Sequence, residues 1–167
     1  MHQEQQLPLL PAQVAALLQP QAVRLELRAR EKLPALRELA GALKAHPHLA
    51  QPEVFFREVL ARERVHNTGL GHGIAMPHAR SALCRDLVIA VGRSAEGLDY
   101  GAPDGEPVRL LFLVGAPLHR TAPYHRLVVG LARLLESAAN RRHLLEAREP
   151  AGFIRVLSHL RTSARRP

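Results

Sequence analysis

The chain has 167 residues, 47% of them hydrophobic, which is enough to bury one substantial core. The chain has 23 Lys and Arg against 15 Asp and Glu, which gives a formal net charge of +8. A positive charge of this size suits an acidic binding partner. By itself it indicates only non-specific affinity for nucleic acid. A single cysteine excludes an internal disulfide. No apolar run approaches the roughly 18 residues that a membrane-spanning helix needs.

The basic residues do not form a nucleic-acid-binding stripe. They are scattered along the chain, and aromatic residues make up only 4% of it, so stacking side chains do not accompany the positive charge. The densest cluster, Arg161, Arg165 and Arg166, is typical of a solvated chain end. The first residues lack the basic and long apolar regions of a secretory signal. We therefore expect a cytoplasmic protein with no specific nucleic-acid binding.

The first half of the sequence predicts mostly helices. Alternation of apolar and charged residues predicts a strand over Val23–Leu27. Proline favours the first turn of a helix, and Pro34 and Pro52 precede apolar residues at helical spacing. The expected helices are Pro11–Leu18, one from Pro34 to Leu43, and one from Pro52 to about Arg64.

The second half mixes strands and helices. Short runs of branched apolar residues predict strands over Ile74–Met76, Leu87–Val91 and Val108–Val114. Apolar residues at helical spacing predict helices over Tyr124–Ser137, Asn140–Ala147 and Ala151–Leu160. Interleaved strands and helices predict an α/β fold, with a mixed sheet covered by helices. We expect one domain over residues 1–167, with frayed ends at 1–10 and 161–167.

The most informative segment runs from Asn67 to Arg80 and reads NTGLGHGIAMPHAR. Glycines 69, 71 and 73 allow positive φ and leave backbone amides accessible to an anion. The loop matches neither the Walker nor the Rossmann nucleotide pattern. Pro77 stiffens the backbone just before His78, so this imidazole is presented beside an anion-binding loop. The alternatives are that the glycines only form turns and that His78 is structural.

Three segments carry a resemblance to a known family. They are RERV at residues 62–65 followed by TGLGHGIAMPH at 68–78, then DGEPVRLLF at 104–112, then HRLVVGLARL at 125–134. In this order they resemble the type-2 (fructose/mannitol-like) enzyme IIA domains of the bacterial phosphoenolpyruvate:sugar phosphotransferase system. The first segment is most similar to the nitrogen-regulatory branch. The resemblance implies a single-domain mixed α/β fold of the enzyme IIA type.

The resemblance also implies a set of site residues. His78 corresponds to the phosphorylated histidine, His125 to the second active-site histidine, and Arg62 to the arginine that reaches the phosphoryl group. Phosphoryl-binding candidates are Thr68, Gly69, Gly71 and Gly73. From the residues alone, Arg62 is more typical of a solvated helix residue beside Glu63, and His125 of a helix N-terminus. Thr68 is equally typical of a turn.

Two positions depart from the family pattern. His72 stands where the nitrogen-regulatory pattern prefers Asn, and Ala79 where Gly often follows the active histidine. His66, His72 and His78 recur at six-residue intervals, which could suggest a metal site. Six residues is a poor interval for placing side chains on one face of a helix. No carboxylates stand nearby at the spacing of metal ligands, and Cys84 lies outside the loop. We therefore expect no metal site.

The function implied by the resemblance is phosphoryl relay. His78 would accept a phosphoryl group from an HPr-type phosphocarrier, without a nucleotide or organic cofactor, as a carrier component rather than a free-standing enzyme. The acceptor would be either a regulatory protein partner or the cysteine of a IIB domain. Because the sequence contains no permease and no second domain, we expect the nitrogen-regulatory role; the alternative is a fructose- or mannitol-type IIA component of sugar uptake.

Overall fold

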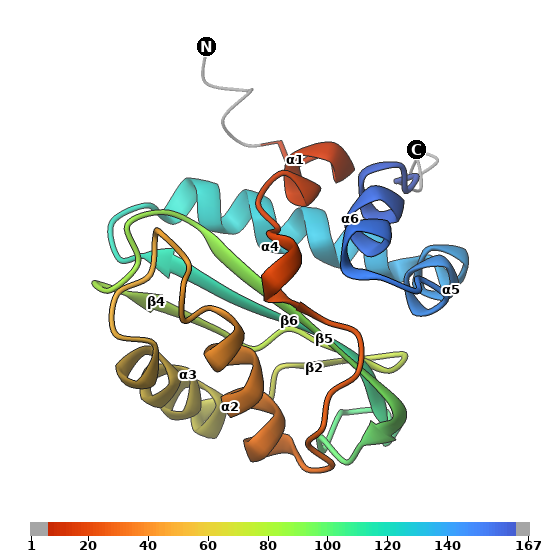
Figure 1. The fold of residues 1–167 in the computed structure, drawn as a ribbon, viewed down its shortest axis with the longest axis horizontal. Coiled ribbons are helices and arrows are strands. Elements are labelled where there is room, and N and C mark those ends of the chain that lie inside the picture. The colour runs from red at the N-terminus through yellow and green to blue at the C-terminus, as the bar shows by residue number, and fades with distance from the viewer. Residues whose placement is uncertain (1–6, 163–167) are drawn as a thin grey trace. The chain divides into compact units, whose positions relative to one another are not determined.

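The computed structural model describes residues 7–162, which form two compact units (Figure 1). The larger unit runs from Gln21 to Leu118, and the smaller one combines residues 7–20 and 119–162. The site residues predicted around His78 all lie in the larger unit, whereas His125 lies in the smaller one.

The larger unit is an α/β structure. Its helices are α2 (Lys32–Ala42) and α3 (Pro52–Val65), and a 3-10 turn (η2, Pro20–Ala22) leads into it. Its strands are β1 (Val23–Arg24), β2 (Gly69–Gly71), β3 (Ile74–Ala75), β4 (His78–Ser81), β5 (Val88–Leu98) and β6 (Val108–Pro117).

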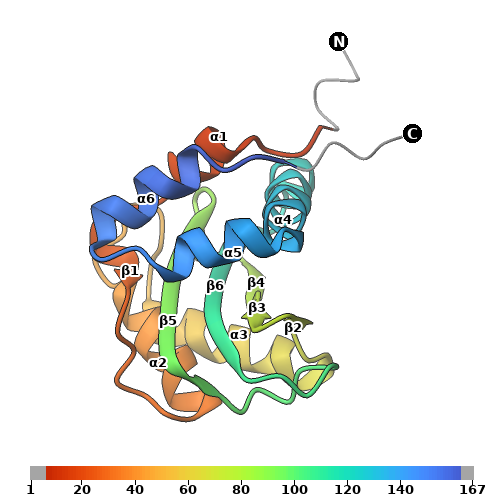
Figure 2. The same ribbon diagram turned by 90° about the vertical axis from the view of Figure 1, so that its right-hand side faces the viewer.

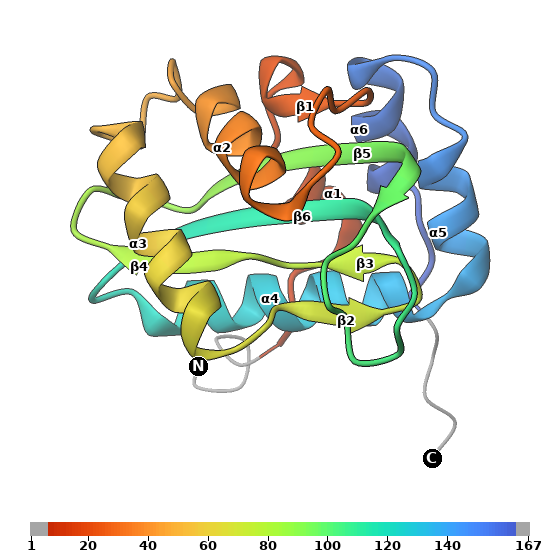
Figure 3. The same cartoon turned by 90° about the horizontal axis from the view of Figure 1, so that it is seen from below.

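These six strands form one mixed sheet in the order β1-β5-β6-β3-β2, with β4 also pairing with β6. Strand β6 runs antiparallel to β5 and parallel to β3 and β4. Figure 3 shows β4 and β3 following one another along the same side of β6. Ala75 pairs with Leu111 and His78 with Val114, so both strands keep one register on β6.

Pro77 lies in the gap between β3 and β4. It has no N–H to offer to a sheet ladder, but its carbonyl accepts a hydrogen bond from Val114 N at 2.9 Å. The proline therefore separates β3 from β4 while the chain stays hydrogen-bonded to β6. This places His78 at the first residue of β4.

The core of the larger unit lies between the sheet and the helices α2 and α3, which pack against each other (Figure 2). Buried members from the helices include Leu36, Leu39, Phe55 and Val59. Gly115 of β6 permits close packing here, because a Cβ at this position would lie 2.6 Å from Val88 and 2.9 Å from Phe55. The apolar spacing that predicted these helices thus corresponds to their buried faces.

The smaller unit is helical. It contains α1 (Pro11–Ala15), α4 (Thr121–Glu136), α5 (Ala138–Leu145) and α6 (Pro150–Ser158), and α1 contacts both α4 and α6. Gly130 on α4 allows the Leu9 carbonyl to approach, since a Cβ there would lie only 2.6 Å from that oxygen. Leu9 N donates to the Arg126 carbonyl at 3.0 Å, so the described part of the N-terminal segment is bound to α4.

The structure confirms the α/β class and the mixed sheet, and corrects several boundaries. Helix α2 begins at Lys32, two residues before Pro34, and α4 begins at Thr121, three residues before Tyr124. Both prolines concerned, Pro34 and Pro123, still fall in the first turn, where no N–H is needed. Strand β1 is shorter than the expected strand over Val23–Leu27.

Strands β2 and β4 were not among the predicted elements. Both lack the β-branched residues that favour a strand, since they read GLG and HARS. Residues 1–6 and 163–167 of the expected frayed ends lie outside the described residues. Across residues 7–162, no helix is long and apolar enough to cross a membrane.

Candidate functional site

The glycine-rich loop forms a hairpin between β2 and β3. At its tip His72 has a φ of 55° and is exposed, between Gly71 and Gly73 with φ of 84° and 75°. Asn is the side chain that adopts this left-handed conformation most readily after glycine. The family preference for Asn at this position is therefore a backbone requirement, which His72 meets at some conformational cost.

The carboxylate of Asp104 caps this hairpin. Its Oδ2 accepts the backbone N–H of His72 at 2.8 Å, and its Oδ1 accepts that of Glu106 at 3.1 Å. These hydrogen bonds, the one from His72 first, lower the pKa of Asp104. A Cβ on Gly71 would lie 3.0 Å from Oδ2, so glycine permits this approach. An internal anion thus occupies part of the loop that the sequence predicts to bind phosphoryl.

Gly69 also has an internal partner. Its N–H donates to Asn67 Oδ1 at 2.8 Å, and Asn67 Nδ2 donates in turn to the Tyr100 carbonyl at 2.7 Å. This arrangement favours a turn-stabilising role for Gly69. Phosphoryl binding by Gly69, Gly71 and Gly73 remains a prediction.

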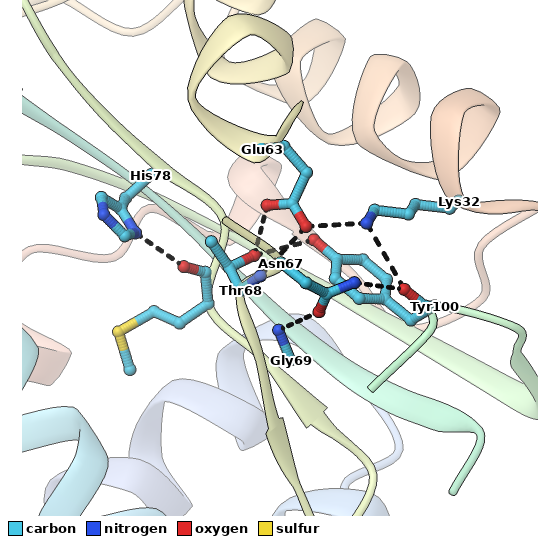
Figure 4. A network of polar contacts seen from close by, with 8 residues as sticks. Lys32, Glu63, Asn67, Thr68, Gly69, His78 and Tyr100 are labelled. Atoms are coloured by element: carbon cyan, nitrogen blue, oxygen red, sulfur yellow. Dashed lines mark hydrogen bonds and ion pairs between the residues drawn. The ribbon is translucent and has the colours of Figure 1, made fainter. Parts of the chain in front are cut away.

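His78 is half-buried, and its ring is oriented by the backbone two residues earlier. Its Nδ1 lies 2.9 Å from the carbonyl oxygen of Met76 (Figure 4). A carbonyl can only accept a hydrogen bond, so in the neutral ring the proton is on Nδ1 and the lone pair is on Nε2. In this tautomer Nε2 is the ring nitrogen that could act as a nucleophile.

A polar cluster with a buried carboxylate lies close to His78. It is formed by Lys32, Glu63, Thr68 and Tyr100 and is called the Glu63 cluster below (Figure 4). Glu63 accepts the Thr68 hydroxyl at 2.5 Å and the Thr68 backbone N–H at 3.0 Å. Because a carboxylate only accepts, the single hydroxyl proton of Thr68 goes to Glu63. This favours the structural alternative for Thr68 over donation to a phosphoryl group.

Lys32 and Tyr100 complete the Glu63 cluster. Lys32 Nζ lies 2.8 Å from Glu63 Oε1 and 4.2 Å from the centre of the Tyr100 ring. The Tyr100 hydroxyl is 3.0 Å from Thr68 Oγ1. Burial is the main cause that raises the pKa of Tyr100, so the phenol stays protonated and donates to that oxygen. Every buried charge in the cluster has a partner.

Arg62 lies beside Glu63 near the C-terminal end of α3. Its guanidinium Nη1 is buried and has no hydrogen-bond partner among the described residues. One helical turn earlier, Glu58 Oε2 is in the same situation. A buried guanidinium nitrogen without an acceptor is costly, and a bound anion would supply the missing acceptor.

His125 and His66 lie on other elements of the chain. His125 is exposed on the second turn of α4, in the smaller unit, and His66 is exposed at the end of α3. Residues 7–162 contain no group of three His, Cys, Asp or Glu side chains placed to hold a metal ion. Cys84 is buried in the larger unit.

Comparison with known proteins identifies the family. Residues 16–160 match the family described as "Phosphoenolpyruvate-dependent sugar phosphotransferase system, EIIA 2". A nitrogen regulatory protein of Bradyrhizobium diazoefficiens is 30% identical over 87% of this chain and 94% of its own length. The fructose-specific EIIABC component of Bacillus subtilis is also 30% identical over 87% of this chain, which spans only 23% of that longer protein.

Solved structures give the same result. The nitrogen regulatory protein IIA-Ntr of Neisseria meningitidis superposes with a TM-score of 0.79 and 25% identity, covering 86% of this chain and 98% of that one. Enzyme IIA mannitol of Escherichia coli has a TM-score of 0.71 at 20% identity, covering 84% and 98% of the two chains, and shares the fold. The chain therefore belongs to the EIIA type-2 family of the phosphoenolpyruvate-dependent sugar phosphotransferase system.

Proposed function

We propose that this protein is a phosphoryl carrier that is phosphorylated on His78 by an HPr-type protein. We further propose that it acts mainly as a nitrogen-regulatory IIA protein, whose binding to a partner depends on its phosphorylation state. The observation that carries the proposal is the hydrogen bond between His78 Nδ1 and the Met76 carbonyl. It holds the ring with Nε2 as nucleophile, as phosphoryl transfer requires.

The chemistry follows from this tautomer. The Nε2 lone pair of His78 forms the new bond to phosphorus, and the nitrogen–phosphorus bond of the donor phosphohistidine breaks, returning its electron pair to the donor ring. The Nδ1 proton does not leave, so the hydrogen bond to Met76 persists. It also stabilises the positive charge that develops on the imidazole as Nε2 bonds to phosphorus.

Charge stabilisation of the transferred group is assigned to Arg62. Phosphoryl transfer depends mainly on positioning and on neutralising the equatorial oxygens. The buried Nη1 of Arg62 lacks an acceptor among the described residues, and a phosphoryl oxygen would satisfy it. His125 remains the proposed second histidine on the strength of its place in the family motif.

Support for the regulatory role comes from the relatives and from the surface of the larger unit. The nitrogen regulatory structure superposes with the higher TM-score of the two compared above. The last turn of α3 and the residues up to β2 expose Arg64 and His66 together with the apolar side chains of Val65, at the end of α3, and Leu70, in β2, which are 70% and 49% exposed. Such a surface suits a protein partner that is both acidic and partly apolar.

Phosphorylation would change the charge of the larger unit. A phosphoryl group adds close to two negative charges at His78, in a stretch of sequence that also carries the basic residues His72 and Arg80. An acidic partner should then bind the unphosphorylated form more tightly, and a tenfold ratio corresponds to about 1.4 kcal/mol.

The alternative is a sugar-specific IIA component that passes the phosphoryl group to a separate IIB protein. It is favoured by the 30% identity to the fructose-specific protein of Bacillus subtilis. Enzyme IIA mannitol of Escherichia coli, which has the same fold, is known in a complex with phosphorylated enzyme IIB mannitol.

Partner capture from native lysate separates the two roles. The wild type is used in its unphosphorylated and enzymatically phosphorylated forms, with His78→Ala as the form that cannot change state. Regulation predicts a partner retained by the unphosphorylated protein and by His78→Ala, and released from the phosphorylated protein. Equal retention by all three forms would contradict regulation, and transfer of the label to a IIB cysteine would establish the transport role.

A further inference from the structure

We infer that the Glu63 cluster is a positioning device for His78, with Glu63 and Tyr100 acting through Thr68. This inference rests on the proposed function of His78. It concerns two residues, Glu63 and Tyr100, that lie outside the set expected to touch the phosphoryl group. Figure 4 shows the cluster together with His78.

The connection between the cluster and the histidine is a short series of hydrogen bonds. Glu63 accepts from both the backbone N–H and the hydroxyl of Thr68. The Thr68 carbonyl accepts the backbone N–H of Met76 at 3.0 Å. The Met76 carbonyl then accepts from His78 Nδ1 at 2.9 Å. A displacement of Thr68 is therefore transmitted to the group that sets the tautomer of His78.

The cluster is built to hold Thr68 in one place. Glu63 is attached to the last full turn of α3, and its side chain is only 4% exposed. Two hydrogen bonds from one residue to one carboxylate fix both the distance and the orientation of that residue. Tyr100 holds the same hydroxyl from the other side, at 3.0 Å. The Thr68 hydroxyl thus donates once and accepts once, and a different rotamer would lose both bonds.

The burial of the Glu63 carboxylate also needs a reason. Burying a carboxylate and an ammonium group is costly, and an apolar replacement of similar volume is often as stable. Lys32 offsets the charge of Glu63 at 2.8 Å, and only 23% of its side chain is exposed. A buried ion pair is therefore better explained by orientation of Thr68 than by stability alone.

The short strands explain why such a device is needed. Strand β3 has two residues, and Met76 and Pro77 lie between β3 and β4. The Met76 N–H is used by Thr68, not by the neighbouring strand β6, and Pro77 has no N–H. The orientation of the Met76 carbonyl consequently depends on the β2 side of the hairpin, where Thr68 is anchored by Glu63.

The test measures the tautomer of His78 in the unphosphorylated full-length chain, from the ring-nitrogen shifts in long-range proton–nitrogen spectra. The variants are Glu63→Gln and Tyr100→Phe, and the matched control is Glu53→Gln, which removes the same charge from an exposed position on α3. Wild type and the control should show a neutral ring with the proton on Nδ1. Glu63→Gln should show a mixed tautomer population, and Tyr100→Phe a smaller shift in the same direction.

The phosphorylation rate is measured in parallel with a fixed amount of phosphorylated HPr. A misplaced reacting group slows transfer by about ten- to a hundredfold, and we expect a loss of that size for Glu63→Gln and none for Glu53→Gln. Unchanged tautomer populations in every variant that folds would overturn the inference, even if the melting temperature falls. A wild-type chain that accepts no phosphoryl group would instead refute the proposed function, and the tautomer spectra would still decide the positioning role.

Discussion

The carboxylate of Asp104 accepts the backbone N–H of His72 at 2.8 Å, which joins the β5–β6 connection to the tip of the β2–β3 hairpin. This relationship ties together two segments of the family motif that are 32 residues apart. It explains why an acidic residue and a glycine-rich loop occur together without requiring a phosphoryl ligand. The hairpin that leads to His78 is thus held by an anion of the protein itself.

The Asp104 contact makes the hairpin sensitive to acid. Hydrogen bonds from His72 and Glu106 lower the pKa of Asp104 below its ordinary value of 3.8. The carboxylate therefore stabilises the folded hairpin fully above pH 3.8. This stabilisation is lost as the pH falls through the lowered pKa of Asp104 in the folded protein. The amide proton shift of His72 should therefore titrate with a midpoint below 3.8. A midpoint at or above 3.8 would show that the contact does not form in solution.

Cys84 should be inert in the native protein. Burial, followed by the nearby charge of Glu58, raises the pKa of the thiol to about 12, so the reactive thiolate is scarce at neutral pH. An aromatic disulfide reagent at pH 8 should modify the unfolded chain quickly and the native chain only as fast as it opens. Rapid modification of the native chain would contradict this account, which treats Cys84 as a core residue and not as a phosphoryl acceptor.

Gly115→Ala should destabilise the larger unit. The added Cβ would meet Val88, Phe55 and Cys84 within 2.6–3.0 Å, and overpacking of a filled core costs about 1–3 kcal/mol. The matched control is Gly41→Ala on α2, where the added Cβ meets nothing within 4 Å and helix propensity should add about 0.5–1 kcal/mol. Urea unfolding of both variants measures the difference. Equal midpoints would show that β6 does not pack as closely as described.

Much of the fold could be predicted because its long elements carry their own pattern. The buried residues of α3 repeat at helical spacing, and the apolar run of Val108–Val114 became the central strand β6. Strands β2 and β4 could not be found in this way, since GLG and HARS owe their strand geometry to pairing with β3 and β6. Their pairing is a long-range property that local composition does not carry.

The site was predictable only in part, because some of its contacts join residues that are far apart in the sequence. The family motif singles out His78 and Arg62, but the Glu63 cluster joins residues separated by up to 68 positions. Glu63 lies inside the motif at residues 62–65, but neither it nor Lys32 nor Tyr100 was among the predicted site residues. One indication was available, because Lys32 is one of only two lysines in a chain otherwise rich in arginine.

Arg62→Ala and His125→Ala should slow phosphoryl transfer without unfolding the protein. Loss of one charge-assisted contact to the transferring group costs about 2–4 kcal/mol, which is roughly 30-fold or more in rate. Arg64→Ala is the matched control for Arg62, since Arg64 is exposed in the same last turn of α3. Single-turnover transfer from phosphorylated HPr and thermal melting give the two readouts. Wild-type transfer rates in both variants would show that Arg62 and His125 take no part in phosphoryl transfer.

The central claim is that His78 carries the phosphoryl group, and mapping the modified residue tests it most directly. The protein is incubated with phosphoenolpyruvate, enzyme I and HPr from its own source, and the acid-labile phosphoryl group is located by mass spectrometry of the digested chain. We expect a single phosphorylated residue, His78, and no stable labelling of His78→Ala, whereas the variant His72→Asn should be labelled like the wild type. Labelling of His78→Ala to the wild-type level would contradict the account.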